Sequence, residues 1–249
     1  MSGHSKWATI KRKKGKTDAE RGRLFTRLIK EITIAARSGG GDESSNPRLR
    51  TAVLAAKGAN MPAANIDRAI KRGTGELEGV NYEEVVYEGF GPNGTAILIE
   101  AVTDNKNRTV AEIRHMFSKH GGNLGVSGSV ARLFTKKGII VVPAATTTED
   151  DLMMATLDAG PDDIQLDGDS FRVVTEPGKF EPVKKALDAA GIKYESAEIS
   201  MEASNTVKVE GKQAESLLKL METIEEHDDV QNAYSNFDID ENTLASLNG

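Results

Sequence analysis

The sequence contains no cysteine and only one tryptophan, and aromatic residues make up 5% of its 249 residues. The absence of cysteine excludes disulfide bonds, thiolate nucleophiles and zinc sites built on thiolate ligands. No stretch approaches the roughly 18 apolar residues that a membrane-spanning helix needs, and no apolar run of the secretory type follows the basic N-terminus. We therefore expect a cytoplasmic protein without a membrane partner.

The net charge of -6 conceals a strong asymmetry along the chain. Residues 1–75 hold 17 Lys and Arg against 6 Asp and Glu, a balance of +11, whereas the remaining residues hold 15 against 32, a balance of -17. Hydrophobic residues at 38% and charged residues at 28% are ordinary for a folded protein. Because the asymmetry lies within a chain of ordinary composition, it indicates a function for the basic part, such as binding a polyanion.

Residues 1–78 are predicted to form a basic helical domain with three helices. Apolar residues recur at three- and four-residue spacing from Asp18 until Ser38, where three glycines follow. A second helix is expected after Asn46, an N-cap candidate that precedes a proline. A third helix is expected after Pro62 and should end before Gly73. Further glycines at 75 and 79 indicate a linker to different material.

Strands and helices alternate after residue 79. Residues 137–203 follow the order strand, helix, strand, strand, helix, strand, which is typical of a ferredoxin-like domain. The flanking segments 95–135 and 206–237 each follow the order strand, helix, strand, and together they would form a second copy. The expected elements include a helix that starts at Thr109, with Glu112 in capping-box spacing, and separate strands at 130–135 and 138–142.

These patterns predict an α+β fold, in which an N-terminal three-helix domain is followed by two ferredoxin-like α/β domains. The second α/β domain, residues 137–203, would be inserted into the first, a discontinuous domain of residues 79–136 plus 204–249. One large mixed sheet is the alternative topology.

Catalytic and metal-binding motifs are incomplete. Gly15-Lys16-Thr17 is similar to the end of a P-loop, but Ile10 stands where the motif requires glycine. His115 and His120 are five positions apart and do not share a helix face. Paired acids such as Asp228-Asp229 are interpreted as solvated charge. We expect no enzyme activity, no cofactor and no metal site.

The basic residues of the first part are candidates for contact with phosphates. Six cations lie within eleven positions around Trp7, which either stacks on a base or packs against the helices. A basic stripe is expected along the first long helix. The loop 104–109 either holds a phosphate at a helix N-terminus or serves only as a cap and turn. The candidate nucleic-acid-binding residues are Lys6, Trp7, Lys11, Arg12, Lys13, Lys14, Lys16, Arg23, Arg27, Lys30, Arg48, Arg50, Arg68, Lys71, Arg72, Lys106 and Arg108.

Five separated motifs occur in order, namely Gly3-His4-Ser5-Lys6-Trp7, Asn46-Pro47-Arg48-Leu49-Arg50, Tyr87-Glu88-Gly89-Phe90-Gly91-Pro92, Asp104-Asn105-Lys106-Asn107-Arg108-Thr109 and Gly121-Gly122-Asn123-Leu124-Gly125. With these motifs, the sequence resembles the YebC family over nearly its whole length. The resemblance implies a three-domain bacterial or organellar protein with a helical N-terminal domain. Family members are described as probable transcriptional regulators that bind DNA, and others as translation factors acting at the ribosome, including a mitochondrial translational activator.

We expect a nucleic-acid-binding regulator of gene expression, with DNA, ribosomal RNA or both as partners. The ribosome or another protein would meet the acidic domains. A body with a charge balance of -17 is repelled by long duplex DNA, so the charge favours a mixed RNA and protein target. Two alternatives from other classes are an interaction scaffold, whose acidic domains dock a basic protein, and an enzyme or small-ligand sensor built on the ferredoxin-like domains.

Overall fold

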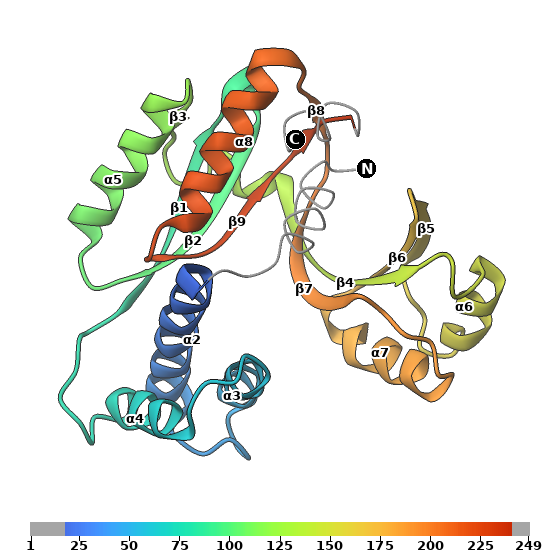
Figure 1. Ribbon diagram of the computed structural model, residues 1–249, viewed down its shortest axis with the longest axis horizontal. Helices are drawn as coiled ribbons and strands as arrows, with labels where there is room; N and C mark the ends of the chain where they lie inside the picture. The colour runs from blue at the N-terminus through green and yellow to red at the C-terminus, as the bar shows by residue number, and fades with distance from the viewer. Residues whose placement is uncertain (1–17, 241–249) are drawn as a thin grey trace. The chain divides into compact units, whose positions relative to one another are not determined.

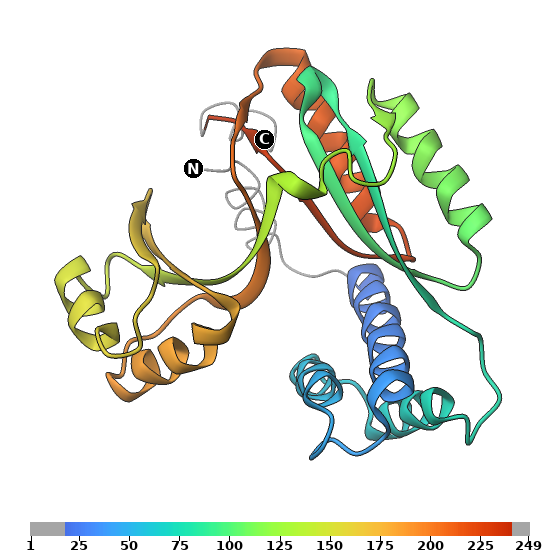
Figure 2. The same cartoon turned by 180° about the vertical axis from the view of Figure 1, so that it is seen from behind.

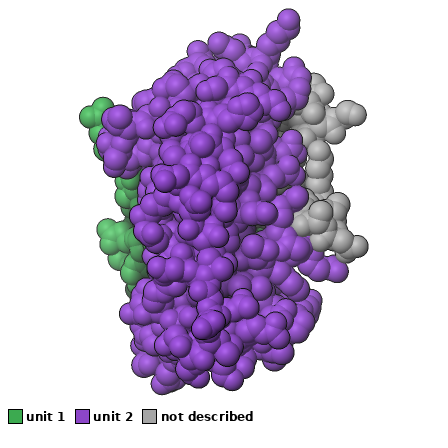
Figure 3. All heavy atoms as spheres, turned by 90° about the vertical axis from the view of Figure 1, so that its left-hand side faces the viewer, with its two compact units in different colours: residues 1, 132–206 green, residues 2–131, 207–249 purple. Residues whose placement is uncertain are grey.

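The computed structural model describes residues 18–240, with side chains from residue 21 onward. The described chain divides into two compact units (Figure 3), which we call the inserted unit, residues 132–206, and the outer unit, residues 18–131 and 207–240. Helices come first and two four-stranded antiparallel sheets follow (Figure 1), which confirms the α+β fold class. Between residues 18 and 240, no helix is long and apolar enough to cross a membrane.

Three helices open the outer unit: α2 (Asp18–Gly39), α3 (Pro47–Gly58) and α4 (Ala63–Thr74). Their apolar faces meet in one core that includes Ile32, Leu49 and Val53, all fully buried. Asn46 caps α3 as expected, because its side-chain oxygen accepts a hydrogen bond from the Leu49 amide at 3.0 Å. The sequence pattern thus predicted all three helices from their apolar periodicity and their caps.

The third helix was expected to end before Gly73, but it ends after Gly73, at Thr74. α4 continues through Gly73 to Thr74, and Gly75 adopts the left-handed conformation, φ +84°, that ends many helices. Gly73 is buried where α4 crosses α2, since a Cβ at this position would lie 2.4 Å from the carbonyl oxygen of Thr33. This glycine serves close packing between two helices rather than helix termination.

The four-stranded sheet of the outer unit has the order β3-β1-β2-β9. Its elements are β1 (Glu83–Phe90), the 3-10 turn η1 (Pro92–Gly94), β2 (Ala96–Thr103), α5 (Lys106–Lys119), β3 (Asn123–Leu124), α8 (Gly211–Glu226) and β9 (Val230–Ser235). The two helices pack on one face of the sheet through Ile113, Phe117 and Leu217, among others. Accordingly α8 lies in front of the strands in Figure 1 and behind them in Figure 2.

One strand of this sheet differs from the sequence-based assignment. The segment 206–237 was expected to begin with a strand of the second ferredoxin-like copy, but β8 (Val207–Lys208) pairs in parallel with β10 (Phe237–Asp238) in a separate two-stranded sheet. β1 takes the position beside β2, because the short turn at 91–95 joins the two as a hairpin paired over eight residues.

The inserted unit has the strand order β5-β6-β4-β7 and the chain order expected of a ferredoxin-like domain. Its elements are η2 (Ala131–Leu133, which crosses the boundary), β4 (Phe134–Pro143), α6 (Glu149–Thr156), β5 (Asp163–Asp167), β6 (Ser170–Thr175), η3 (Pro177–Lys179), α7 (Phe180–Ala189) and β7 (Ser196–Ala203). The two strands expected at 130–135 and 138–142 are one strand, β4. Gly138 does not interrupt it, since this residue pairs with Thr175 on one side and Ile199 on the other.

Candidate nucleic-acid interface

The predicted contact residues divide into two groups. Lys6, Trp7, Lys11, Arg12, Lys13, Lys14 and Lys16 lie outside the described residues, so their role stays a prediction. The other ten lie on α2, α3, α4 and the first turn of α5. The partners of these ten side chains reveal which cations are available to a ligand.

The basic stripe on α2 faces the protein itself. Arg23 pairs with Glu226 at 3.2 Å between Nη2 and Oε1, and the Arg27 guanidinium donates to the backbone carbonyl of Glu225. Both acceptors belong to the C-terminal end of α8. A surface pair such as Arg23 with Glu226 contributes only ~0–1 kcal/mol by itself, but together these contacts attach α2 to the α/β part of the outer unit.

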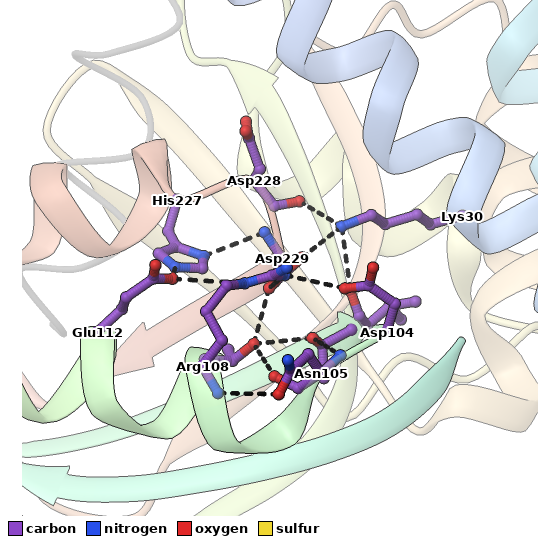
Figure 4. Close-up of polar contacts among 11 residues, drawn as sticks. Lys30, Asp104, Asn105, Arg108, Glu112, His227, Asp228 and Asp229 are labelled. Atoms are coloured by element: carbon purple, nitrogen blue, oxygen red, sulfur yellow. Dashed lines mark hydrogen bonds and ion pairs between the residues drawn. The ribbon is translucent and has the colours of Figure 1, made fainter. Parts of the chain in front are cut away.

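Lys30 anchors this attachment (Figure 4). Its side chain is buried, and its Nζ lies 2.6 Å from Asp229 Oδ1, 2.9 Å from the carbonyl oxygen of Asp228 and 3.2 Å from that of Val102. A buried ammonium with three protein acceptors cannot reach a phosphate in solvent. The assignment of Lys30 to a nucleic-acid-binding stripe is therefore wrong, because the lysine neutralises an interior carboxylate.

Asp229 is held from its other side by α5. Its Oδ2 accepts from Arg108 Nη2 at 2.6 Å and from Thr109 Oγ1 at 2.7 Å, and its backbone amide donates to His227 Nδ1 at 3.1 Å. Burial would raise the pKa of Asp229, but the hydrogen bonds from Lys30, Thr109 and Arg108 outweigh it and hold the pKa far below its usual range. The interpretation of Asp229 as solvated charge is wrong, since 2% of the residue is exposed.

The loop at 104–109 is a helix cap. α5 begins at Lys106 instead of Thr109, and the Asn105 side chain accepts a hydrogen bond from the Arg108 amide at 3.1 Å. Lys106 pairs with Glu83, and Arg108 pairs with Asp104 at 3.0 Å as well as with Asp229. The hydrogen bond that Arg108 donates to Asp229 raises the pKa of Arg108. The loop was expected either to hold a phosphate or to serve only as a cap and turn, and the structure shows the cap and turn.

A cleft of about 610 Å³ opens beside this cluster and is lined mainly by charged side chains. Five carboxylates, including Asp104, Glu112 and Asp228, face three Lys or Arg side chains and His227. This balance disfavours a polyanion in the cleft. Across residues 18–240, no group of three His, Asp or Glu side chains is placed to hold a metal ion.

On α3, two candidate arginines also have protein partners. Arg48 lies between two carboxylates, with 2.7 Å from its Nε to Glu31 Oε1 and 2.6 Å from its Nη2 to Glu84 Oε1. The Arg50 guanidinium donates to the carbonyl oxygens of Glu43 and Ser44 and keeps its charge unpaired. Arg48 is thus neutralised locally, whereas Arg50 still presents a positive charge at the surface.

α4 presents the clearest basic surface in the described chain. Arg68 and Arg72 are exposed, are four positions apart on one helix face, and make no ion pair with any residue of 18–240. Lys71 pairs with Asp67 at 3.0 Å at the exposed side of the same helix. Arg50, Arg68 and Arg72 therefore remain available for an anionic ligand.

Fold and charge together define a class of protein with a basic three-helix module and an α+β body whose carboxylates neutralise part of that module. Two family models match the chain. The TACO1/YebC protein N-terminal domain covers residues 5–76, and the TACO1/YebC second and third domain covers residues 82–237. The chain belongs to the TACO1/YebC family.

Curated relatives match over almost the whole length. A protein from Desulfatibacillum aliphaticivorans named "Probable transcriptional regulatory protein" is 58% identical, covering 98% of this chain and 99% of the relative. One from Koribacter versatilis with the same description is 57% identical over 100% of both chains. A crystal structure of a conserved hypothetical protein from Aquifex aeolicus is 48% identical, with a TM-score of 0.82, and covers 95% of this chain and 98% of that one. These relatives match the chain over nearly its whole length.

Proposed function

We propose that this chain is a nucleic-acid-binding regulator of gene expression that acts by binding and not by catalysis, in the cytoplasm. The observation that carries the proposal is the concentration of cations in residues 1–75, which have a charge balance of +11 against -17 in the remainder. A surface that neutralises several phosphates gains affinity by releasing condensed counterions. The names of the relatives, which refer to transcriptional regulation, support the same class of role.

The contacts of the outer unit narrow the proposed surface. α2 directs Arg23, Arg27 and Lys30 toward the protein, so the contact surface consists of residues 6–16 together with Arg50, Arg68 and Arg72. These arginines have exposed guanidinium groups, which suit bidentate contact with phosphate oxygens. None of them points to recognition of a particular base.

The acidic residues after position 75 favour RNA within a nucleoprotein particle over DNA as the partner. The strongly acidic remainder is repelled by a long uniform duplex. A ribosome offers RNA for the basic surface and basic proteins for the acidic one. We therefore propose ribosomal RNA as the principal partner, and DNA-bound regulation of transcription as the second reading supported by the relatives' names.

The first experiment measures affinity of the full chain for a labelled ribosomal RNA fragment and for a labelled DNA duplex between about 50 and 200 mM salt. A variant reverses four charges, Lys11→Glu, Arg12→Glu, Lys13→Glu and Lys14→Glu. A matched control reverses four exposed cations elsewhere, Lys136→Glu, Lys185→Glu, Lys193→Glu and Lys212→Glu. The first variant should lose affinity at least about tenfold and bind with a weaker salt dependence, while the control should lose about threefold or less.

Equal losses in both variants would show that only total charge matters, and wild-type binding without salt dependence would refute the proposal. Crosslinking in living cells, followed by sequencing of the attached nucleic acid, separates the two partners. Predominant ribosomal RNA supports the principal reading, predominant promoter DNA supports the second, and recovery of neither contradicts the proposed function.

A further inference from the structure

One helix of the inserted unit exposes large apolar side chains to solvent. On α6, Met153 is 52% exposed, Met154 is 79% exposed, and Leu157, which follows the helix in helical conformation, is 76% exposed. Leu157 lies four positions after Met153 and three after Met154, so the three side chains form one face. The opposite face carries Leu152 and Thr156, which are fully buried in the unit. Packing of α6 on the core of the unit therefore does not explain why these three exposed side chains are apolar.

The neighbouring strand carries a further exposed apolar side chain. α6 packs beside β5, which is an edge strand of the sheet. Leu166 of β5 is 62% exposed and lies on the same side of the sheet as Ile164, which packs on the helix-covered core. We call Met153, Met154, Leu157 and Leu166 the α6 patch. Soluble monomers rarely gather exposed apolar side chains in this way unless a partner covers them.

The sequence segment that contains the α6 patch is strongly acidic. Between Lys137 and Arg172 the sequence has eight Asp or Glu and no Lys or Arg. Glu149, Asp150 and Asp158 are exposed and make no ion pair with any residue of the described chain. Acids in the first turn favour the helix N-terminus, but that role does not account for Asp158, which comes after the helix; Asp162 pairs with Lys137 at 2.7 Å.

An apolar centre with an acidic rim selects its ligand by complementarity. Its partner needs apolar side chains to cover the methionines and leucines, and cations to meet the carboxylates. Methionine is flexible and polarisable, so it adapts to apolar side chains of differing shape. An anionic lipid surface and a nucleic acid are both disfavoured by the acidic rim, and a second copy of the same patch would bring like charges together.

We propose that the α6 patch is a docking site for a basic amphipathic segment of a protein partner, with apolar side chains at helical spacing and lysines or arginines on either side. Met154 and Leu157 form the contact centre, and the acids at 149, 150 and 158 attract the cations of the segment. The site belongs to the inserted unit, shares no residue with the cations of residues 1–75, and does not depend on nucleic-acid binding.

The test uses the full chain and a labelled peptide of lysine and leucine, with its leucines at helical spacing, followed by fluorescence anisotropy. A peptide of the same composition with scrambled order and a glutamate and leucine peptide serve as ligand controls. The variant Met154→Ser/Leu157→Ser should weaken binding of the amphipathic peptide about tenfold or more. The matched control Leu54→Ser/Val126→Ser removes two exposed apolar side chains elsewhere, 60% and 77% exposed, and should change affinity by about twofold or less.

The charge requirement is tested by Asp150→Asn/Asp158→Asn, which should weaken binding about threefold or more at low salt and less at high salt. Equal affinity of both peptides of the same composition, or equal effects of the two apolar variants, would overturn the proposal. Tighter peptide binding after charge reversal at residues 11–14 would identify the chain's own basic segment as the occupant and would also overturn it. Unchanged nucleic-acid affinity in Met154→Ser/Leu157→Ser would separate this site from the proposed function.

Discussion

Replacing Lys30 by methionine keeps the length of the side chain but leaves the carboxylate of Asp229 without its buried ammonium. Three hydrogen bonds are lost, to Asp229 at 2.6 Å and to the carbonyls of Asp228 and Val102 at 2.9 and 3.2 Å. Removing one partner of a buried pair typically costs ~3–5 kcal/mol. Because Arg108 and Thr109 still hold Oδ2 of Asp229, we expect the lower end, about 3 kcal/mol.

The assay is chemical unfolding of Lys30→Met followed by circular dichroism, with hydrogen exchange of α2 and β9 to localise the effect. Exchange should accelerate in both elements, since the lost contact joins them. The control Lys57→Met changes a lysine that is 59% exposed and should leave the unfolding free energy almost unchanged. In a double-mutant cycle with Asp229→Asn, the double variant should lose about 2 kcal/mol less than the sum of the single losses.

A loss in Lys30→Met no larger than that in Lys57→Met would refute the interior role of Lys30. The same variant also tests the site assignment, because a lysine buried in the protein contributes no phosphate contact. Under conditions where Lys30→Met is folded, its affinity for RNA should stay within about twofold of wild type. A tenfold loss with unchanged unfolding would restore Lys30 to the interface.

Three further outcomes follow from the outer unit. The depressed pKa of Asp229 gives stability that is present above the ordinary aspartate pKa of about 4 and is lost as the pH falls below it. Asp229→Asn should therefore flatten the acid limb of unfolding free energy against pH, and an unchanged limb would contradict the assignment. Gly73→Ala places a Cβ 2.4 Å from the Thr33 carbonyl oxygen and should cost ~1–3 kcal/mol in thermal unfolding, whereas Gly58→Ala, with open space around it, should be neutral or stabilising. Asn46→Ala removes the α3 cap and the donor to the carbonyls of Ala35 and Gly40. It should lower the free energy of unfolding by about 2 kcal/mol. A loss below about 0.5 kcal/mol would show that solvent replaces these contacts.

The sequence by itself determined the local elements. Apolar residues at helical spacing predicted α2, α3 and α4, and Asn46 before a proline predicted the start of α3. The order of strands and helices in residues 137–203 predicted the ferredoxin-like inserted unit. These features depend on residues near one another in the chain, so periodicity and capping preferences are sufficient to identify them.

Only the tertiary structure decided which strands pair in the outer sheet and which charges meet. Sequence order does not reveal that β8 lies outside the four-stranded sheet and pairs with β10 instead, because pairing between distant segments leaves no local pattern. Lys30 on a helix face has the same local pattern as a solvated lysine. It becomes an interior residue only because Asp229, 199 positions later, is brought to 2.6 Å from it. Burial of a charge depends on its partner across the fold, and that partner lies outside any local pattern.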